Sequence, residues 1–587
     1  MCGIFAYTGM ETDAAEKILE GLKVLEYRGY DSWGIAIVHD EGIKIQKNVG
    51  KIGDAKTNLP SSTIGIGHTR WATHGGVTIE NAHPHLDQTG RIAVVHNGII
   101  ENYHDLKLKL IKKGHTFSSE TDTEIVAHLI QEELLKKDDL KSALMNTFKQ
   151  LIGSNAICML DKKTDSIGVC RNGSPIVIGK SKKATIVGSD VTALLKYTKK
   201  IVYLEDGQGA VINDISLEIF RLSNGKTVIT KETTIDWEVE DAQKEKFPHF
   251  LIKEIYEQKE AIQKSVTSNT GRLDPVASKI REGYKVVLIG CGTASNCALA
   301  AKYFFAKNNI QAESYGGYEF APFKHFINKK TVVIAISQSG ETADTIIAVK
   351  EAKRRGALIT ALVNARGSTL ERIADITLPI NAGPEIAVVS TKAFTGQLAL
   401  LYLLAYSVNG QEKIAMKNLE KLSISLTQWL NKDLETHIIS VAKGLMDKEH
   451  IYIIGKHLNY PAAMEASLKI KEVSYIHSEH FAAGELKHGV IALIENGTPC
   501  ICLSSEDEVK HELLSSAAEL KARGGRIIGI APYDSGEFDI SIKTPNVGEL
   551  TIFPNIIAAQ LLAYYLAVGK GNDVDKPRNL AKSVTVK

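Results

Sequence analysis

The second half of this chain repeats its own pattern of apolar strands, turns and helices. The stretches 284–292, 331–342 and 356–368 resemble 450–457, 498–509 and 524–536, respectively. Ile289 and Ile454 lie 165 residues apart, and Gly356 and Gly524 lie 168 apart. Each copy alternates strand, loop and helix, which predicts a parallel sheet covered on both faces. We therefore expect two similar α/β lobes, with a ligand cleft at their strand ends or between them.

The first 235 residues show a different pattern, in which many short strand-like runs are broken by Gly, Asn and Asp. This pattern predicts a sheet-rich domain. A charged stretch at 236–249 separates it from the repeats, and 587 residues are too many for one core. We expect a first domain at 1–238, a linker at 239–249, lobes at 250–425 and 426–573, and a tail at 574–587.

Composition excludes several classes of partner. The chain has 70 Lys and Arg against 68 Asp and Glu, a net charge of +2, and no long block of one sign, so neither nucleic acid nor an anionic membrane is expected. The apolar run at 556–568 contains Gln560 and is shorter than the roughly 20 residues of a membrane span, which indicates a buried helix. The N-terminus lacks the pattern of a signal peptide. Seven cysteines without zinc-ligand spacing favour a cytoplasmic protein with no metal and no cofactor.

The chain begins MCGIF, so removal of Met1 would give Cys2 both a thiol and a free α-amine. An α-amine with a pKa near 8 is partly neutral at pH 7 and could act as a base toward the thiol. One residue would then supply both nucleophile and base. Cys2 alone fits equally well as a small buried residue, because cysteine is among the most often buried types.

A His-Asn-Gly triplet follows the strand-like run that begins at 91. The side-chain amide of Asn97 and the N–H of Gly98 could both point at one oxyanion. Asn-Gly is also the commonest tight-turn pair, so a plain turn is the alternative.

Two charged residues of the first domain match the two ends of an α-amino acid. Arg70 could bind a carboxylate and Asp122 an ammonium group, although either alone would be taken for a salt-bridge residue. The spacing of His74, His83 and His85 matches no metal site, so we expect structural or gating roles for them.

In the first lobe, SQSGET (337–342) lies between a buried strand and a helix. Its hydroxyl groups and the first N–H groups of the helix would form a donor-rich cup for a phosphate monoester, with an ordinary helix cap as the alternative. It lacks the lysine of a nucleotide P-loop. Gly290 and Gly292 are weak evidence for a dinucleotide site because Ser295 replaces the third glycine, so we reject it and regard Thr293 as a second phosphate donor.

The helix expected at 461–476 carries Glu465, Lys469 and Glu472 on one face. The apolar positions around them indicate burial, where such groups could move protons, but a solvated row of salt bridges is equally compatible. His488 is a candidate acid or base. Lys582 would serve as a Schiff-base lysine only if the tail folds into a site, and a solvated lysine is the commoner case.

Taken together, MCGI, HTRWATHG, HNG and the segment around Asp122 resemble the N-terminal-nucleophile glutamine amidotransferases. The resemblance implies an α+β domain of stacked antiparallel sheets between helix layers, and hydrolysis of L-glutamine through a thioester. In it Cys2 is nucleophile and base, Asn97 and Gly98 form the oxyanion hole, and Arg70 and Asp122 hold glutamine. The residues that align around the pocket are Arg28, Trp71, Thr73 and His74.

SQSGETADT, STKAFT, KEVSYIHSEHFAAGELKHG and NLAKSVTV extend the resemblance to the whole chain, which is similar to the isomerizing glutamine:fructose-6-phosphate amidotransferases. It implies two sugar-isomerase lobes with parallel sheets that bind fructose 6-phosphate and release glucosamine 6-phosphate. The implied sugar-phosphate contacts are Thr293, Ser337, Gln338, Ser339, Thr342, Val389, Ser390, Lys469 and Ala581. In the implied chemistry Lys582 forms an imine, Glu472 moves a proton between C1 and C2, and His488 of a neighbouring subunit helps open the ring.

The same resemblance implies a homodimer and an ammonia channel gated by Trp71. Two positions depart from the family pattern, Ala294 where many relatives have serine and Trp33 where a small residue is usual. The competing hypotheses are an amidotransferase with a different phosphosugar acceptor, such as a phosphoribosyl compound, and a non-catalytic sugar-phosphate sensor.

The role of the α-amine gives the first prediction. A form that retains Met1 should show no glutamine-dependent synthesis, because the amine of Cys2 is then an amide without basic character. Intact mass establishes which form is present, and an adduct with a glutamine analogue maps the nucleophile. Full activity of a Met1-retaining form would contradict the prediction.

Overall fold

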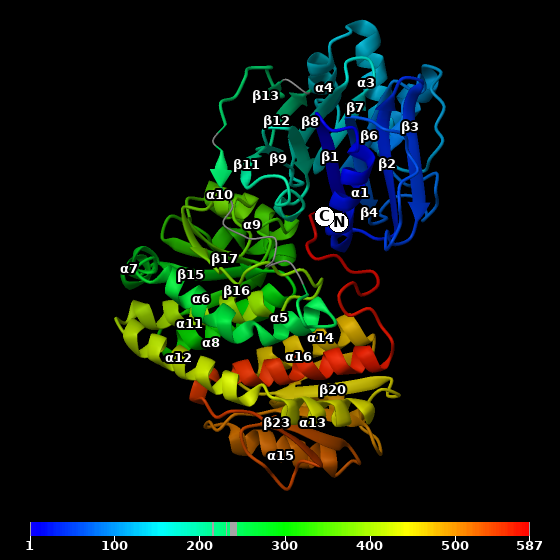
Figure 1. The fold of residues 1–587 in the computed structure, drawn as a ribbon. Helices are drawn as coiled ribbons and strands as arrows, with labels where there is room; N and C mark the ends of the chain where they lie inside the picture. Colours follow the sequence, from blue (N-terminus) through cyan, green and yellow to red (C-terminus); the bar gives the residue numbers. More distant parts are fainter. Residues whose placement is uncertain (1, 214–215, 231, 235–243, 586–587) are drawn as a thin grey trace. The chain divides into compact units, whose positions relative to one another are not determined.

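The structure is a computed structural model that describes residues 2–213, 216–230, 232–234 and 244–585 (Figure 1). The chain divides into two compact units, the first comprising residues 1–242 and 581–587 and the second residues 243–580. The division falls inside the charged stretch at 236–249, of which residues 236–243 lie outside the described part. The last residues of the chain therefore belong to the first unit.

The first unit contains two antiparallel sheets. The eight-stranded sheet has the order β14 (Thr233–Thr234), β11 (Lys200–Tyr203), β9 (Val177–Lys180), β10 (Ala184–Gly188), β1 (Gly3–Gly9), β4 (Ile64–Arg70), β2 (Ser32–His39), β3 (Gly42–Val49). The six-stranded sheet has the order β13 (Leu217–Arg221), β12 (Gln208–Ile212), β8 (Ser166–Asn172), β7 (Asn155–Asp161), β6 (Ile92–Gly98), β5 (His85–Leu86).

These sheets form the two inner layers of a four-layer unit. Alternate strand residues such as Ile66 and Val95 face each other between the sheets in one apolar core. Helix α1 (Ala14–Leu25) covers the other face of the larger sheet. The other face of the smaller sheet is covered by α2 (Tyr103–Lys112), α3 (Glu124–Lys136) and α4 (Leu140–Phe148). The expected α+β fold is confirmed, and Trp33 packs into the core beneath α1.

The second unit contains two five-stranded parallel sheets of identical topology, as the internal repeat predicts. The first has the order β16 (Ala312–Gly316), β15 (Lys285–Gly290), β17 (Thr331–Ser337), β18 (Leu358–Val363), β19 (Ile376–Pro379). The second has the order β21 (His477–Ala482), β20 (His450–Gly455), β22 (Pro499–Leu503), β23 (Arg526–Ala531), β24 (Ile540–Lys543).

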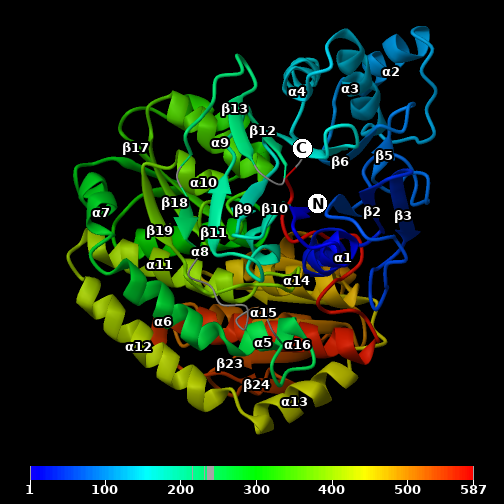
Figure 2. The same cartoon turned by 45° about the horizontal axis from the view of Figure 1, so that its top comes forward.

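Helices accompany both sheets (Figure 2). Around the first lobe they are α5 (Phe250–Tyr256), α6 (Gln258–Asn269), α7 (Asp274–Arg281), α8 (Thr293–Lys307), α9 (Ala343–Arg354), α10 (Thr369–Ile373), α11 (Lys392–Val408) and α12 (Glu412–Trp429). Around the second they are α13 (Lys432–Lys443), α14 (Asn459–Ser474), α15 (Lys510–Lys521) and α16 (Ile552–Gly569).

The repeat extends to individual interactions. In the first lobe Asp375 accepts a hydrogen bond of 2.8 Å from the N–H of Ile359 and pairs with Lys353. In the second lobe Asp539 accepts one of 2.7 Å from Ile527 and pairs with Lys521. An equivalent carboxylate in each lobe thus fixes the start of the fourth strand of that lobe.

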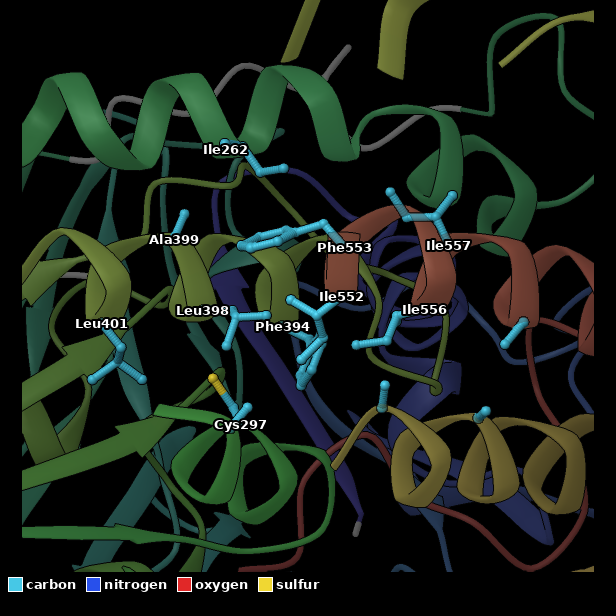
Figure 3. Packing of buried hydrophobic residues seen from close by; sticks show 14 of the residues in the cluster. Ile262, Cys297, Phe394, Leu398, Ala399, Leu401, Ile552, Phe553, Ile556 and Ile557 are labelled. Atoms are coloured by element: carbon cyan, nitrogen blue, oxygen red, sulfur yellow. The ribbon is translucent and has the colours of Figure 1, made fainter. Parts of the chain in front are cut away.

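One apolar core joins the two lobes around α11 and α16. In Figure 3 Phe394 and Leu398 of α11 lie close to Ile552 and Phe553 of α16. The helical segment Gly548–Gly569, which contains α16, is long and apolar enough to cross a membrane, but 83% of its most apolar window is buried inside the protein. The sequence-based interpretation of this segment as a buried helix is therefore confirmed.

The central position of Phe553 predicts a large effect on stability. Phe553→Ala should lower the free energy of unfolding by about 3–5 kcal/mol, because it leaves a cavity where α11 meets α16. Ile414→Ala, on an exposed position of α12, is the control and should cost under about 1 kcal/mol. Urea unfolding of the full chain measures both, and equal losses would contradict the prediction.

Candidate active sites

Cys2 immediately precedes β1, whose pairing with β4 places Gly3 opposite Thr69. A side chain at Gly3 would come within 2.5 Å of the Thr69 hydroxyl, so this position needs glycine. The Sγ of Cys2 accepts a hydrogen bond of 3.3 Å from the backbone N–H of Trp71. Burial raises the pKa of the thiol, and the bond from Trp71 opposes this only in part. A nucleophilic Cys2 therefore needs a base beside it.

Asn97 lies next to Cys2 in a fixed orientation. Its Nδ2 donates a hydrogen bond of 2.9 Å to the carbonyl oxygen of Cys2. His68 Nε2 donates to Asn97 Oδ1 at 3.1 Å and to the carbonyl of His96 at 3.0 Å. Burial lowers the pKa of His68 to about 3, so the ring is neutral and carries its proton on Nε2. By holding Oδ1, His68 thereby turns the amide N–H groups of Asn97 toward the backbone of Cys2.

The Asn-Gly pair is not a tight turn. Strand β6 pairs with β7 as far as Gly98 opposite Asn155, so the turn alternative is wrong. Gly98 has φ +140°, and a Cβ there would lie 1.9 Å from the carbonyl oxygen of Ser154. Only glycine fits this position.

Arg70 and Asp122 are both buried and hold loops of the site in place. The guanidinium of Arg70 donates to the carbonyl oxygens of Gly76 at 3.0 Å and Gly75 at 3.1 Å, and also to that of His74. Asp122 accepts a hydrogen bond of 2.8 Å from the N–H of Ile100, two residues after Gly98.

The loop after Arg70 carries the other residues expected around glutamine. Thr73 is exposed, and the ring of His74 lies edge-on to Tyr103.

Two residues before β2 also contact the site. Arg28 Nε donates a hydrogen bond of 3.1 Å to the carbonyl of Cys2, as its place in the family pattern suggests. Asp31 accepts from the N–H of Ala72 at 2.8 Å, and the sequence analysis did not single it out.

His83 and His85 form a buried aromatic cluster with His68. The rings of His68 and His83 stack at 4.2 Å, and His85 Nε2 contacts the hydroxyl of Thr121 at 3.0 Å. Burial lowers the pKa of both residues. Within the described ranges, the structure contains no group of three or more His, Cys, Asp or Glu side chains that could hold a metal ion.

In the second unit, the loop Ser337–Thr342 joins β17 to α9, as the sequence predicts. Ser337 Oγ accepts from the N–H of Gly340 at 2.9 Å, and Ser339 Oγ accepts from Glu341 at 3.2 Å. Thr342 occupies the N-cap of α9 but makes no side-chain cap hydrogen bond, so the plain-cap alternative fails there. The carbonyl of Gln338 anchors the loop by accepting from Asn364 at 3.0 Å.

Glu465, Lys469 and Glu472 form a row on α14 that faces the first lobe. Lys469 Nζ donates to Thr293 Oγ1 at 2.9 Å and lies 3.2 Å from Glu465 and 2.7 Å from Glu472. The side chains of Glu465 and Lys469 are 0% and 2% exposed, so the alternative of a solvated row is wrong. The carboxylate of Glu465 also accepts hydrogen bonds from Thr293 and from Asn296, both on α8. The sequence analysis did not select Asn296.

Burial acts in opposite directions on the two buried members of this row. It raises the pKa of Glu465, with Lys469 opposing. Burial would lower the pKa of Lys469, but the attraction of Glu465 and Glu472 outweighs it, so that pKa is raised. Lys469 therefore stays charged, donating a hydrogen bond to Thr293 and forming ion pairs with both carboxylates.

Val389 and Ser390 lie on the loop that leads into α11. Glu385, buried and not selected from the sequence, accepts from the Ser390 hydroxyl at 3.1 Å and from the N–H groups of Thr391 at 2.9 Å and Ala393 at 3.0 Å. This carboxylate folds the loop back on itself, and Val389 is buried within it.

Three further site residues lie in short or terminal segments. His488 ends a 3-10 helix (Ala483–His488) and is exposed. Ala581 and Lys582 are partly buried and belong to the first unit, in which the carbonyl of Thr585 accepts a hydrogen bond of 3.4 Å from Ser154. The approach of Lys582 to Glu472 stays a prediction.

Comparison with known proteins fits both halves of the chain. Residues 68–196 match the glutamine amidotransferase domain, and residues 279–407 and 444–568 match the SIS domain. The fold and the sites thus define a glutamine amidotransferase joined to paired sugar-isomerase lobes.

Full-length relatives identify the family. The glutamine–fructose-6-phosphate aminotransferases (isomerizing) of Thermococcus kodakarensis and Aquifex aeolicus are 42% and 40% identical, each over 100% of both chains. The C-terminal domain of the glucosamine-fructose-6-phosphate aminotransferase of Francisella tularensis superposes with a TM-score of 0.53 at 31% identity, covering 57% of this chain and 100% of that one. This chain belongs to the family of isomerizing glutamine–fructose-6-phosphate aminotransferases.

The buried charge row predicts a strong dependence on Lys469. Lys469→Met should lower the free energy of unfolding by about 3–5 kcal/mol, because it leaves Glu465 buried without its cation. Adding Glu465→Gln should recover part of this loss. Urea unfolding of the single and double variants gives the coupling.

The matched control removes a lysine from a half-exposed pair. Lys521→Met breaks the ion pair with Asp539, in which the lysine and aspartate side chains are 36% and 34% exposed. This variant should lower the free energy of unfolding by under about 1 kcal/mol. An equally small loss for Lys469→Met would contradict the prediction.

Proposed function

We infer that this chain hydrolyses L-glutamine and transfers the ammonia to fructose 6-phosphate with ketose-to-aldose isomerisation, giving glucosamine 6-phosphate and glutamate. Membership of the family over the full length supports this activity. The observation that carries it is the placement of the Cys2 thiol against the N–H of Trp71, with the side-chain amide of Asn97 bonded to the carbonyl oxygen of the same cysteine. A sugar-phosphate sensor would not need this arrangement.

In the first unit the geometry suits attack on a carboxamide. The α-amine of Cys2, free after removal of Met1, takes the thiol proton, and the thiolate attacks the amide carbon of glutamine. The developing oxyanion is held by Nδ2 of Asn97 and the N–H of Gly98. Ammonia leaves as the thioester forms, and water then releases glutamate. Arg70 and Asp122 bind the carboxylate and ammonium of the substrate.

In the second unit the hydroxyls of Thr293, Ser337, Ser339 and Thr342 and the side chain of Gln338 bind the phosphate at the N-terminus of α9. Ser390 and the backbone of Val389 hold sugar hydroxyls, and Ala581 lies close to the sugar.

The sugar chemistry follows from two lysines and one carboxylate base. Lys582 forms an imine at C2, with loss of water, and ammonia displaces the lysine. Glu472 carries the proton between C1 and C2. Lys469, charged and held between two carboxylates, supports ring opening and sugar binding.

The remaining proposals concern assembly and coupling. We propose a cytoplasmic homodimer, in which the exposed His488 of one subunit enters the sugar site of the other. Ammonia moves through an internal channel gated by Trp71. Sugar binding orders the tail and activates glutamine hydrolysis, and equal glutamine turnover with and without fructose 6-phosphate would contradict this coupling.

Two variants separate the half-reactions. Cys2→Ala should abolish glutamate release and product formation while leaving fructose 6-phosphate binding intact. Glu472→Gln should keep glutamine hydrolysis and lower product formation by at least about a hundredfold, because a general base contributes 10²–10⁴-fold. Glutamate assay, mass spectrometry of the amino sugar phosphate and calorimetry measure these outcomes. Product formation by Cys2→Ala from glutamine would overturn the proposal.

A further inference from the structure

Asp575 lies at the root of the C-terminal tail, where it joins three segments that are far apart in the sequence. Its carboxylate accepts hydrogen bonds from the N–H groups of Phe250 at 3.0 Å and Leu251 at 2.8 Å, the first residues of α5. A carboxylate at this end of a helix is favoured by two charge-assisted bonds and by the helix dipole. The side chain is only 10% exposed.

The backbone of Asp575 holds the loop that carries Val389 and Ser390, the residues proposed to bind sugar hydroxyls. Its carbonyl oxygen accepts a hydrogen bond of 3.0 Å from the N–H of Val388, the residue before Val389 and Ser390. Glu254 on α5 holds the same loop one residue earlier, by accepting from the N–H of Ala387 at 3.1 Å. Asp575 and α5 therefore hold consecutive residues of this loop, and Asp575 also fixes the start of α5.

The tail on either side of Asp575 is attached to α14, which carries Glu472. Nδ2 of Asn572 donates to the carbonyl of Val473 at 2.9 Å. The N–H of Arg578 donates to the hydroxyl of Tyr475 at 2.7 Å, and its guanidinium lies 4.2 Å from the centre of that ring. The segment that leads to Lys582 is thus anchored at the end of the helix that bears the proposed base.

We propose that Asp575 is a positioning residue for the sugar reaction, fixing the loop of Val389 and Ser390 and the root of the Lys582 tail to the N-terminus of α5. This inference rests on the proposed function. Asp575 touches neither substrate nor the reacting atoms and acts through the loop and the tail. Loss of its carboxylate releases the backbone of Asp575 from α5. It weakens sugar binding and imine formation together, because that backbone bonds the loop and begins the tail.

Asp575→Asn tests the proposal while keeping the size of the side chain. It should raise the KM for fructose 6-phosphate by about tenfold, the effect of losing charge-assisted hydrogen bonds, and leave the KM for glutamine unchanged. Borohydride trapping of the sugar on Lys582 at a fixed low sugar concentration should fall by a similar factor. Asp575→Ala should have the larger effect, and Lys244→Met, which removes only a half-exposed partner 3.4 Å away, should change the KM less than about twofold.

Asp539→Asn is the matched control, because Asp539 also accepts a backbone N–H bond but does so at the start of β23. It should lower the melting temperature without changing either KM. Equal KM values for Asp575→Asn and Asp539→Asn would overturn the inference.

Calorimetric binding of fructose 6-phosphate separates this inference from the proposed function. If the wild-type chain binds the sugar but makes no product, the proposed function fails, and the affinity ratio of Asp575→Asn to wild type still decides the inference. If the wild-type chain does not bind the sugar, both are overturned.

Discussion

The buried pair of Glu465 and Lys469 is the interaction on which the sugar half of this protein depends. A carboxylate and an ammonium group without exposure to water are stable only when each is fully hydrogen-bonded, and here the partners come from both lobes. Thr293 and Asn296 of the first lobe form hydrogen bonds with this pair, which belongs to the second lobe. The pair therefore fixes the register between α8 and α14, and Glu472 takes its position from it.

Glutamine chemistry depends on a different constraint, the pairing of β1 with β4. This pairing brings Cys2 against the backbone of Trp71, and strand β6 of the facing sheet supplies Asn97. The raised pKa of the thiol means that burial alone would make Cys2 inert. In the proposed mechanism a free α-amine resolves this conflict without another titratable side chain.

The internal repeat allowed the sequence to predict the two parallel sheets, since apolar strands of similar length recur at a constant offset. The repeat alone could not predict which of the two lobes has the ligand-binding site. Asn97 illustrates the limit at residue level, because the Asn-Gly pair has strong turn propensity and only the pairing partner of β6 removes that alternative. The buried residues His68, Asn296 and Glu385 and the partly buried Asp31 escaped selection, because residues that position others carry no local pattern.

The sequence by itself determined the strand and helix periodicities, the duplication, the family and the residue types available for chemistry. These properties are local or follow from comparison along the chain, so no fold is needed to see them. Only the tertiary structure decided that the charges on α14 are buried, that Asn97 is oriented by His68, and that Asp575 links a loop, a helix and a tail. Burial and hydrogen-bond partners depend on residues tens to hundreds of positions away, and packing alone brings those residues together.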